Sequence, residues 1–243
     1  GIFLFFLFAS WGLFGSMPSF EDLENPNSNL ATEIISTDGV TIGKFYNENR
    51  TSIKYSELPK HLVDALVSTE DERFYDHSGI DGRGTLRAMM SLGTNGGAST
   101  LTQQLAKLLF HGEGSKFLPF RIVQKAKEWI IAIRLERQYT KNEIIAMYFN
   151  KADFVNTAVG IRSAAKVYFG KEPRDLTIEE GAMLVGMLKN PSLFNPVRRI
   201  EKVQNRRNVV LGQMVKNGFL KETDKAKLEK KPIVLHFKPE SHH

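Results

Sequence analysis

A nearly continuous helical pattern from Pro59 to Lys230 constrains the fold more than any other feature of the sequence. Apolar residues recur at three- and four-residue spacing through this stretch, which is the period of an amphipathic helix. Gly170 and Gly218 follow predicted last turns and indicate helix ends. Capping boxes mark helix starts at Thr100 with Gln103, Thr140 with Glu143, and Thr177 with Glu180. In a chain of 243 residues, this pattern predicts a mainly α fold with a full core.

Glu70 falls on the apolar stripe of the first predicted helix, which begins with Pro59–Val67. It follows Leu66 and Val67 by four and three positions, and Phe74 follows it by four. A carboxylate on that stripe loses hydration, which favours its neutral form and raises its pKa. Such a group suits proton transfer near neutral pH. The alternative interpretation is a surface run of acids, because two more acids follow directly.

Glu128 is a second acid on an apolar helix face. It stands at the entrance to Trp129–Leu135, which is apolar nearly all round and therefore predicts a helix in the centre of a domain. Unpaired buried acids are costly, so the residue needs an explanation. Either Glu128 has a functional role, or it forms a structural ion pair with Lys125 or Arg121.

A glycine loop, Gly93–Ser99, precedes the helix that starts at Thr100. Paired glycines let the backbone approach a ligand closely, and a helix start offers free N–H groups to an anion or a sugar hydroxyl. The loop lacks the Lys-Ser/Thr ending of nucleotide-binding loops. The leucines of the helix predict its core face, which leaves Gln103, Gln104 and Lys107 to point toward a cleft or toward water.

The composition and charge of the chain exclude several kinds of site and partner. The chain has no cysteine, which excludes disulfides and thiolate metal sites. Its net charge of +6 comes without a nucleic-acid-binding signature, so nucleic acid is not an expected partner. His77 has no clustered metal-ligand pattern around it and is expected to be a structural histidine beside Asp76 or Asp81. Two acids on helices, a polar glycine loop and scattered cations fit glycosyl chemistry best.

The N-terminal segment Gly1–Met17 is apolar and uncharged. As a helix it would span roughly 25 Å, a little short of a bilayer core of ~30 Å, and predicts a membrane span whose start is missing. A signal peptide is the alternative, although neither a basic start nor a cleavage site is visible. Acids follow the segment and the first basic residue is Lys44, so the positive-inside rule places the rest of the chain away from the cytoplasm.

Two strand patterns flank the helical stretch. Ala31–Tyr46 alternates apolar and polar residues around Asp38-Gly39, which predicts a β-hairpin. Pro232–Phe237 is expected to be a third strand that pairs with the hairpin, because two strands alone are marginal. These patterns divide the chain into a span at 1–20, a linker with the hairpin at 21–55, a helical domain at 56–230, and a strand and linker start at 231–243.

Five motifs follow one another in order between residues 56 and 220. They are Glu70-Asp71-x-x-Phe74-x-x-His77-x-Gly79, Gly96-Gly97-Ala98-Ser99-Thr100-Leu101-Thr102-Gln103-Gln104, Lys125-x-x-Glu128, Ile144–Asn150, and Glu180–Pro191 with Lys189. With these motifs the chain resembles the peptidoglycan glycosyltransferases, glycosyltransferase family 51. That family occurs in bifunctional class A penicillin-binding proteins and in monofunctional enzymes.

The resemblance implies a lysozyme-like fold with a membrane-facing subdomain, and polymerisation of lipid II into linear glycan strands. Glu70 would be the general base that deprotonates the 4-hydroxyl of the acceptor's N-acetylglucosamine. That oxygen would attack the anomeric carbon of the growing chain, undecaprenyl pyrophosphate would leave, and the configuration would invert to a β-1,4 linkage. Glu128 would be the second catalytic glutamate, at the donor site, while Lys107 and Lys125 would offset charge on the leaving group.

The resemblance also implies a substrate-binding set and a location. The further substrate-binding residues would be Asp71, Phe74, His77, Gly97, Ser99, Thr100, Gln103, Gln104, Asn150 and Lys189. No cofactor is certain, and a Mg or Mn ion at the donor pyrophosphate is left open. The implied partners are lipid II, the growing glycan, the membrane and cell-wall synthesis proteins. The domain would lie on the periplasmic or outer face of the cytoplasmic membrane.

One departure from the family pattern affects the third motif. Gln124 stands where the family usually has arginine. The arginine that normally precedes this motif has no secure counterpart, because Arg121 and Lys116 compete for its place. The resemblance therefore leaves the residue for one pyrophosphate contact unassigned, while it still implies the activity.

Three function classes remain after the resemblance. They are the lipid II polymerase, a muramidase or lytic transglycosylase that cuts finished glycan, and a non-catalytic membrane-anchored module. The second glutamate, the cations and the apolar N-terminal segment favour the polymerase, because a glycan cutter needs no pyrophosphate site. The predicted terminal strand further suggests the front portion of a bifunctional protein that continues into a transpeptidase domain.

Overall fold

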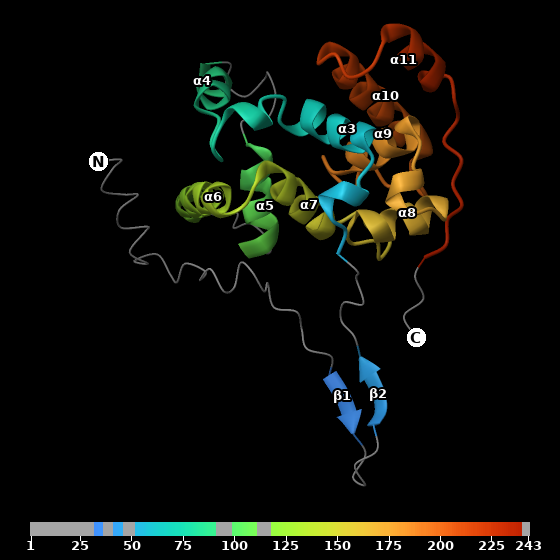
Figure 1. The fold of residues 1–243 in the computed structure, drawn as a ribbon, viewed down its shortest axis with the longest axis horizontal. Coiled ribbons are helices and arrows are strands. Elements are labelled where there is room, and N and C mark those ends of the chain that lie inside the picture. Colours follow the sequence, from blue (N-terminus) through green and yellow to red (C-terminus); the bar gives the residue numbers. More distant parts are fainter. Residues whose placement is uncertain (1–31, 36–40, 46–51, 91–98, 111–117, 240–243) are drawn as a thin grey trace. The chain divides into compact units, whose positions relative to one another are not determined.

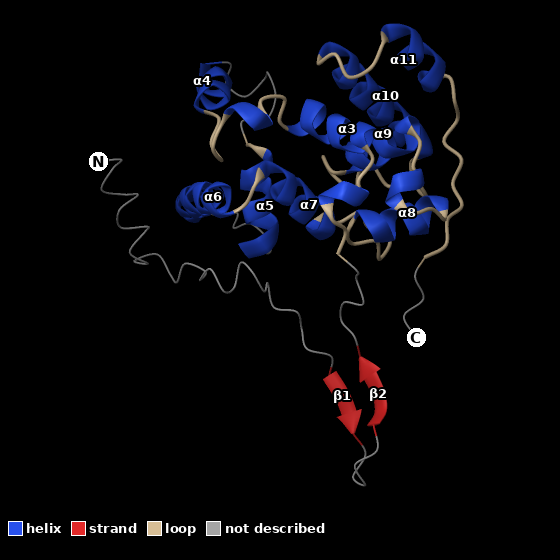
Figure 2. Ribbon diagram, viewed as in Figure 1, coloured by secondary structure: helices blue, strands red, loops and turns tan. Residues whose placement is uncertain are grey.

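The computed structural model describes residues 32–35, 41–45, 52–90, 99–110 and 118–239. Helices predominate among them, and the sheet of this described part has two strands (Figure 2). The chain divides into two compact units, which are residues 1–52 with 115–127, and residues 53–114 with 128–243. The predicted membrane span, Gly1–Met17, lies outside the described residues. Among the described helices, none combines the length and the apolar character that crossing a bilayer requires.

The first unit contains the hairpin. Strand β1 (Thr32–Ile35) pairs antiparallel with β2 (Thr41–Phe45), with Thr32 opposite Phe45 and an irregularity of register after Ile34 (Figure 1). The pairing confirms the predicted hairpin strands, while the Asp38-Gly39 turn lies outside the described residues. Helix α6 (Leu118–Gln138) begins in this unit and ends in the second.

The second unit is helical. Its elements are η1 (Tyr55–Glu57), α3 (Lys60–Glu70), η2 (Phe74–Asp76), α4 (Gly82–Met90), α5 (Leu101–Phe110), the end of α6, α7 (Lys141–Lys151), α8 (Ile161–Phe169), η3 (Pro173–Asp175), α9 (Ile178–Met187), α10 (Ile200–Lys216) and α11 (Glu222–Glu229). Helices α3, α9 and α10 pack on one another, and α5 packs on α7 (Figure 1). A side chain on Gly181 of α9 would come within 3.3 Å of Leu62 on α3, so the missing Cβ lets these helices approach.

The predicted helix boundaries are largely confirmed. Thr140 and Thr177 form complete capping boxes with Glu143 and Glu180. Thr100 accepts the backbone N–H of Gln103 at 3.1 Å, but the reciprocal half of this box is wrong, because the Gln103 amide is buried without a partner among the described residues. Gly170 ends α8 in the left-handed conformation, and Gly218 follows α10 with φ of 76°.

The predicted strand Pro232–Phe237 is wrong. This segment is extended but belongs to no ladder of the described chain, and the sheet remains two-stranded. Its backbone contacts a helix end instead, because the N–H of His236, and that of Lys238 just after the segment, donate to the carbonyls of Tyr168 and Val167, each at 2.9 Å. The last carbonyls of a helix lack partners within the helix, so the end of α8 supplies acceptors that a strand partner would otherwise provide.

The central position expected for Trp129–Leu135 is confirmed in part. Ile131, Ala132 and Leu135 are buried, whereas the remaining residues of this stretch of α6 are half-exposed. Glu128 lies in phase with the buried residues and is itself only 6% exposed. The prediction of a second buried glutamate is therefore confirmed.

The turn between α7 and α8 has left-handed backbone at three successive residues that are not glycine. Val155, Asn156 and Thr157 have φ values of 54°, 50° and 67°. Such conformations cost of order 1–3 kcal/mol each for ordinary residues. The Asn156 side-chain amide donates to the Tyr168 hydroxyl at 3.0 Å and to Asn195 Oδ1 at 3.2 Å. The turn therefore ties the segment after α9 to α8.

Replacing Thr157 with glycine is expected to raise the free energy of unfolding by about 0.5–1 kcal/mol, because Thr157 is exposed and glycine adopts positive φ without strain. Thr157 also donates its hydroxyl to the Asn156 carbonyl at 2.6 Å. Thr157→Ala is therefore the matched control, since it removes the hydroxyl but keeps the Cβ. Urea unfolding measures the free energy of unfolding of both variants. Equal values for the two would contradict backbone strain at residue 157.

Candidate active site

Glu70 is the last residue of α3, and its side chain is 14% exposed. The Gln104 amide donates to Glu70 Oε2 at 3.1 Å, and the Tyr148 hydroxyl donates to Gln104 Oε1 at 3.1 Å. Burial, and secondarily the Glu70 charge, raises the pKa of Tyr148, so its hydroxyl stays protonated and remains a donor. Helices α3, α5 and α7 each contribute one member of this chain of hydrogen bonds.

Arg206 of α10 places a cation beside the same carboxylate. Its Nη2 lies 3.8 Å from Glu70 Oε1, and its side chain is 12% exposed. Burial lowers the pKa of Arg206 while Glu70 opposes that shift, and a guanidinium stays charged in proteins. Arg206 Nε donates to the Gly186 carbonyl at 3.3 Å, and the guanidinium lies 5.9 Å from the centre of the Phe194 ring. These contacts fix the cation toward Glu70.

Asp71 ties the segment after Glu70 to helix α5. Its carboxylate accepts the first backbone N–H of α5, from Leu101, at 2.9 Å, and lies 3.0 Å from His77 Nε2. Gly79 donates its N–H to His77 Nδ1 at 3.3 Å, which leaves the ring proton on Nε2 for Asp71. His77 is therefore structural, as expected, but its hydrogen-bond partner is Asp71 and not Asp76 or Asp81, although His77 lies near enough to Asp81 to interact with its charge. The negative charge of the Asp71 carboxylate also interacts favourably with the positive end of the α5 helix dipole.

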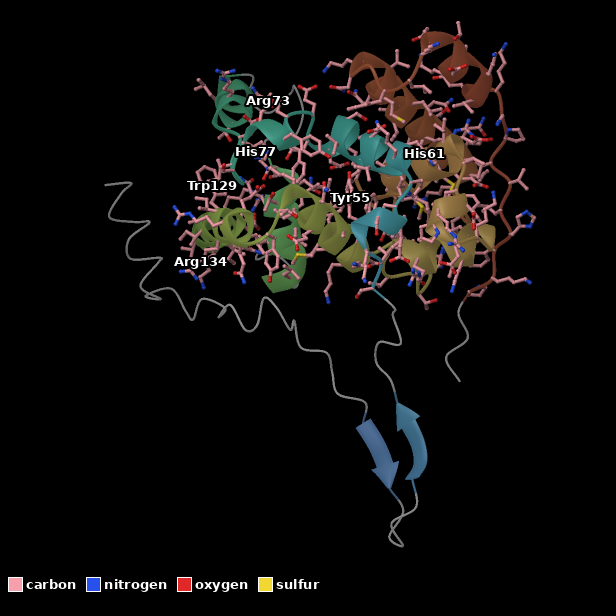
Figure 3. All side chains as sticks on the ribbon, viewed as in Figure 1. Tyr55, His61, Arg73, His77, Trp129 and Arg134 are labelled. Carbon is pink, nitrogen blue, oxygen red and sulfur yellow. The ribbon has the colours of Figure 1, made fainter. Side chains whose placement is uncertain are left out.

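Gly79 brings this segment against α6. Its φ is 91°, and an added Cβ would lie 2.9 Å from the backbone of Ala132, so only glycine fits. The Thr100 hydroxyl donates to the Gly79 carbonyl at 2.7 Å while it caps α5. Glu70 and Gln104 thus lie on elements whose ends are joined by buried hydrogen bonds. Figure 3 shows His77 and Arg73 on the connection between α3 and α4.

Several residues of the predicted substrate-binding set are engaged inside the protein. Phe74 is completely buried, and the Asn150 amide donates to the Ile53 carbonyl at 3.0 Å and accepts its N–H at 2.8 Å. Thr100 and Gln103 are buried as well. These side chains, together with Asp71 and His77, support the site from behind in the described structure.

The remaining predicted residues lie elsewhere. Lys107 and Lys189 are exposed, and Ser99 is half-exposed at the entrance to α5. Lys125 belongs to the first unit, and Gly97 lies outside the described residues. The structure therefore joins Glu70 to Gln104 among the predicted residues.

Sequence reasoning assigned no role to Arg206 or Tyr148. Each is a polar residue on a helix that buries several apolar side chains, among them Phe149 on α7 and Val210 on α10. That combination is the signal that could have identified them. Their distance from Glu70 along the chain, 136 residues for Arg206 (206 minus 70), hides the contact from any local pattern.

A largely buried carboxylate held by a neutral amide and a nearby guanidinium has the features of an acid–base site. The sequence model of the transglycosylase family matches residues 38–215, and the chain belongs to that family. Among the described residues, no cluster of three or more histidine, aspartate and glutamate side chains could hold a metal ion.

Similar proteins carry the name penicillin-binding protein. Penicillin-binding protein 1F of Bacillus subtilis is 37% identical over 215 residues, which are 87% of this chain and 29% of that protein. Penicillin-binding protein 1A of Escherichia coli is 37% identical over 209 residues, which are 84% of this chain and 24% of that protein. The chain thus spans less than a third of these relatives. A crystal structure of penicillin-binding protein 1A from Haemophilus influenzae aligns with 85% of this chain and 21% of that one, at 24% identity and a TM-score of 0.49.

Proposed function

We propose that this chain is a peptidoglycan glycosyltransferase that polymerises lipid II into linear glycan strands. Membership of the transglycosylase family and the names of the relatives support the reaction class. The observation that carries the proposal is the Glu70 carboxylate, which is largely withdrawn from water and held by Gln104 and Arg206. A base for sugar chemistry needs this combination of a fixed direction and limited solvation.

In the proposed reaction, Glu70 takes the proton from the 4-hydroxyl of the acceptor's N-acetylglucosamine. The acceptor oxygen forms a bond to the anomeric carbon of the donor chain as the bond from that carbon to undecaprenyl pyrophosphate breaks. Attack opposite the leaving group turns the α-linked donor into a β-1,4 linkage. Gln104 holds Glu70 Oε2, and Arg206 balances its charge from the Oε1 side.

The donor half of the reaction needs cations for the leaving group. We assign this role to Lys107 and Lys125, with Glu128 supporting the donor site. A Mg or Mn ion at the pyrophosphate is compatible with this assignment, because Mg²⁺ bound to phosphates needs only one or two protein carboxylates. Lipid II lies in a bilayer, so the proposed place of action is the outer surface of the cytoplasmic membrane.

The proposal is tested by giving the chain two substrates in parallel, fluorescent lipid II and purified sacculi. We expect a ladder of glycan polymers from lipid II on a gel and no soluble fragments from sacculi. Soluble fragments without a ladder would instead identify a glycan-cutting enzyme. If neither a ladder nor soluble fragments form, the chain is a non-catalytic module.

Replacing Arg206 with methionine is expected to lower kcat for lipid II about 10- to 100-fold, because removing one partner of a largely buried charge pair leaves the other misplaced and uncompensated. Arg206→Lys should retain part of the rate. Arg198→Met is the control, because Arg198 is exposed. Initial rates of polymer formation measure all three, and equal rates for Arg206→Met and Arg198→Met would remove Arg206 from the site.

A further inference from the structure

Lys141, the first residue of α7, lies at the centre of a polar cluster behind the catalytic glutamate. Its ammonium donates to the His77 carbonyl at 2.7 Å and to Glu136 at 2.8 Å. It also lies 4.2 Å from the centre of the Phe74 ring, which is within cation–π range. One ammonium thus contacts both ends of the segment from Phe74 to His77 and the end of α6.

Glu136 extends the cluster to α5. Its side chain is only 5% exposed, and it accepts a hydrogen bond from the hydroxyl of Thr102, which is fully buried. Thr102 lies two residues before Gln104, the residue whose amide donates to Glu70. The ion pair of Lys141 and Glu136 therefore connects the segment that follows Glu70 with the helix that holds Glu70 in place.

We propose that Lys141 is a positioning residue for Glu70, which acts by locking the Phe74–His77 segment against α5 through Glu136. This inference rests on the proposed glycosyltransferase function. Lys141 does not touch the reacting atoms in this account. Its effect is geometric, because Glu70 ends α3 four positions before Phe74, where the locked segment begins, and Gln104 reaches Glu70 from α5, which Glu136 contacts through Thr102.

The energetics favour a fixed cluster over a loose surface pair. The side chains of Lys141 and Glu136 are 23% and 5% exposed, so water competes weakly for their hydrogen bonds. Removing the ammonium would leave the Glu136 carboxylate buried, with the Thr102 hydroxyl still donating to it but no positive charge from Lys141 beside it. Relaxation of either side would move Glu70 relative to Gln104, and a displacement of about 1 Å at a catalytic group can cost roughly 100-fold in rate.

The test measures kcat and KM for fluorescent lipid II with the wild-type chain and three variants, well below the melting temperature of each. Lys141→Met removes the charge and keeps the length, and Lys141→Arg keeps the charge. Lys60→Met is the matched control. Lys60 is also the first residue of a helix, pairs with Asp64 at 2.7 Å and lies 5.3 Å from the Phe219 ring centre, but its side chain is 81% exposed.

We expect Lys141→Met to lower kcat about 10- to 100-fold with KM changed less than about 3-fold, because substrate binding surfaces remain. Lys141→Arg should recover part of kcat, and Lys60→Met should stay within about twofold of wild type. A purely structural role would lower the melting temperature and leave kcat per folded molecule unchanged. That result, with Lys141→Met within twofold of wild type, would overturn the proposal.

A second variant keeps the test decisive if Lys141→Met does not fold. Thr102→Val removes one hydroxyl and leaves the ion pair intact, and Thr102→Ser keeps the hydroxyl. We expect a lower kcat for valine and not for serine, and equal kcat values would overturn the proposal. A wild-type chain that makes no polymer removes the proposed function and the positioning role together, whereas an active wild type with unaffected variants removes the positioning role alone.

Discussion

Replacing Glu70 with glutamine abolishes polymer formation from lipid II while the fold persists, if Glu70 is the base. Glutamine has nearly the same shape and can still accept the Gln104 amide hydrogen, but it cannot take a proton from the acceptor hydroxyl. Loss of a general base typically lowers the rate about 10²–10⁴-fold. Gel quantification of polymer against time measures the rate, and thermal unfolding reports the fold.

Glu72→Gln is the control for this prediction. Glu72 lies two residues further on, is exposed, and pairs with Lys216 at 2.9 Å on the surface. Its replacement should leave polymerisation close to the wild-type rate, because surface ion pairs contribute little. If Glu70→Gln retained more than half of the wild-type rate with an unchanged melting temperature, another group would have to be the base.

The second large effect is expected at Asp71, on stability. Asp71→Ala removes the acceptor of the Leu101 N–H and of the His77 ring proton in one step. Hydrogen bonds to a buried charge contribute roughly 1.5–3 kcal/mol each, so the free energy of unfolding should fall by about 3 kcal/mol or more. The same change should slow polymerisation, because α5 loses the contact that fixes its start beside Glu70. Chemical unfolding and the polymer gel measure the two effects.

Asp71→Asn and Asp76→Ala are the controls for that prediction. Asparagine keeps one acceptor oxygen for Leu101, so its cost should be smaller than that of alanine. Asp76 lies on the same connection but is exposed, and its loss should change stability by less than about 0.5 kcal/mol. Equal stabilities for Asp71→Ala and Asp76→Ala would show that the buried contacts of Asp71 contribute nothing.

The helices were predictable because their signals are local. Capping at Thr140 and Thr177 and the left-handed stop at Gly170 depend on residues within four positions, and the structure confirms them. The tail 232–237 was not predictable in the same way. Its β-branched and apolar residues favour a strand, but the His236 N–H finds its acceptor on Tyr168, which no local pattern connects to it.

The site shows the same division. Periodicity placed Glu70 and Glu128 on apolar faces, and both are largely or fully buried in the structure. Periodicity could not show that Arg206 lies beside Glu70, since that contact forms only when α3 and α10 pack. It also could not distinguish side chains that line a site from those that support it, because Asn150 and Asp71 carry the same polar groups in either role.

The most direct test of the account follows both products of each transfer. Lipid II labelled on its sugar and on its lipid reports glycosidic linkages and released undecaprenyl pyrophosphate in one reaction. We predict one lipid pyrophosphate for each new β-1,4 linkage with the wild-type chain, and neither product with Glu70→Gln. Release of the lipid pyrophosphate without new linkages, or linkages formed at the wild-type rate by Glu70→Gln, would contradict the account.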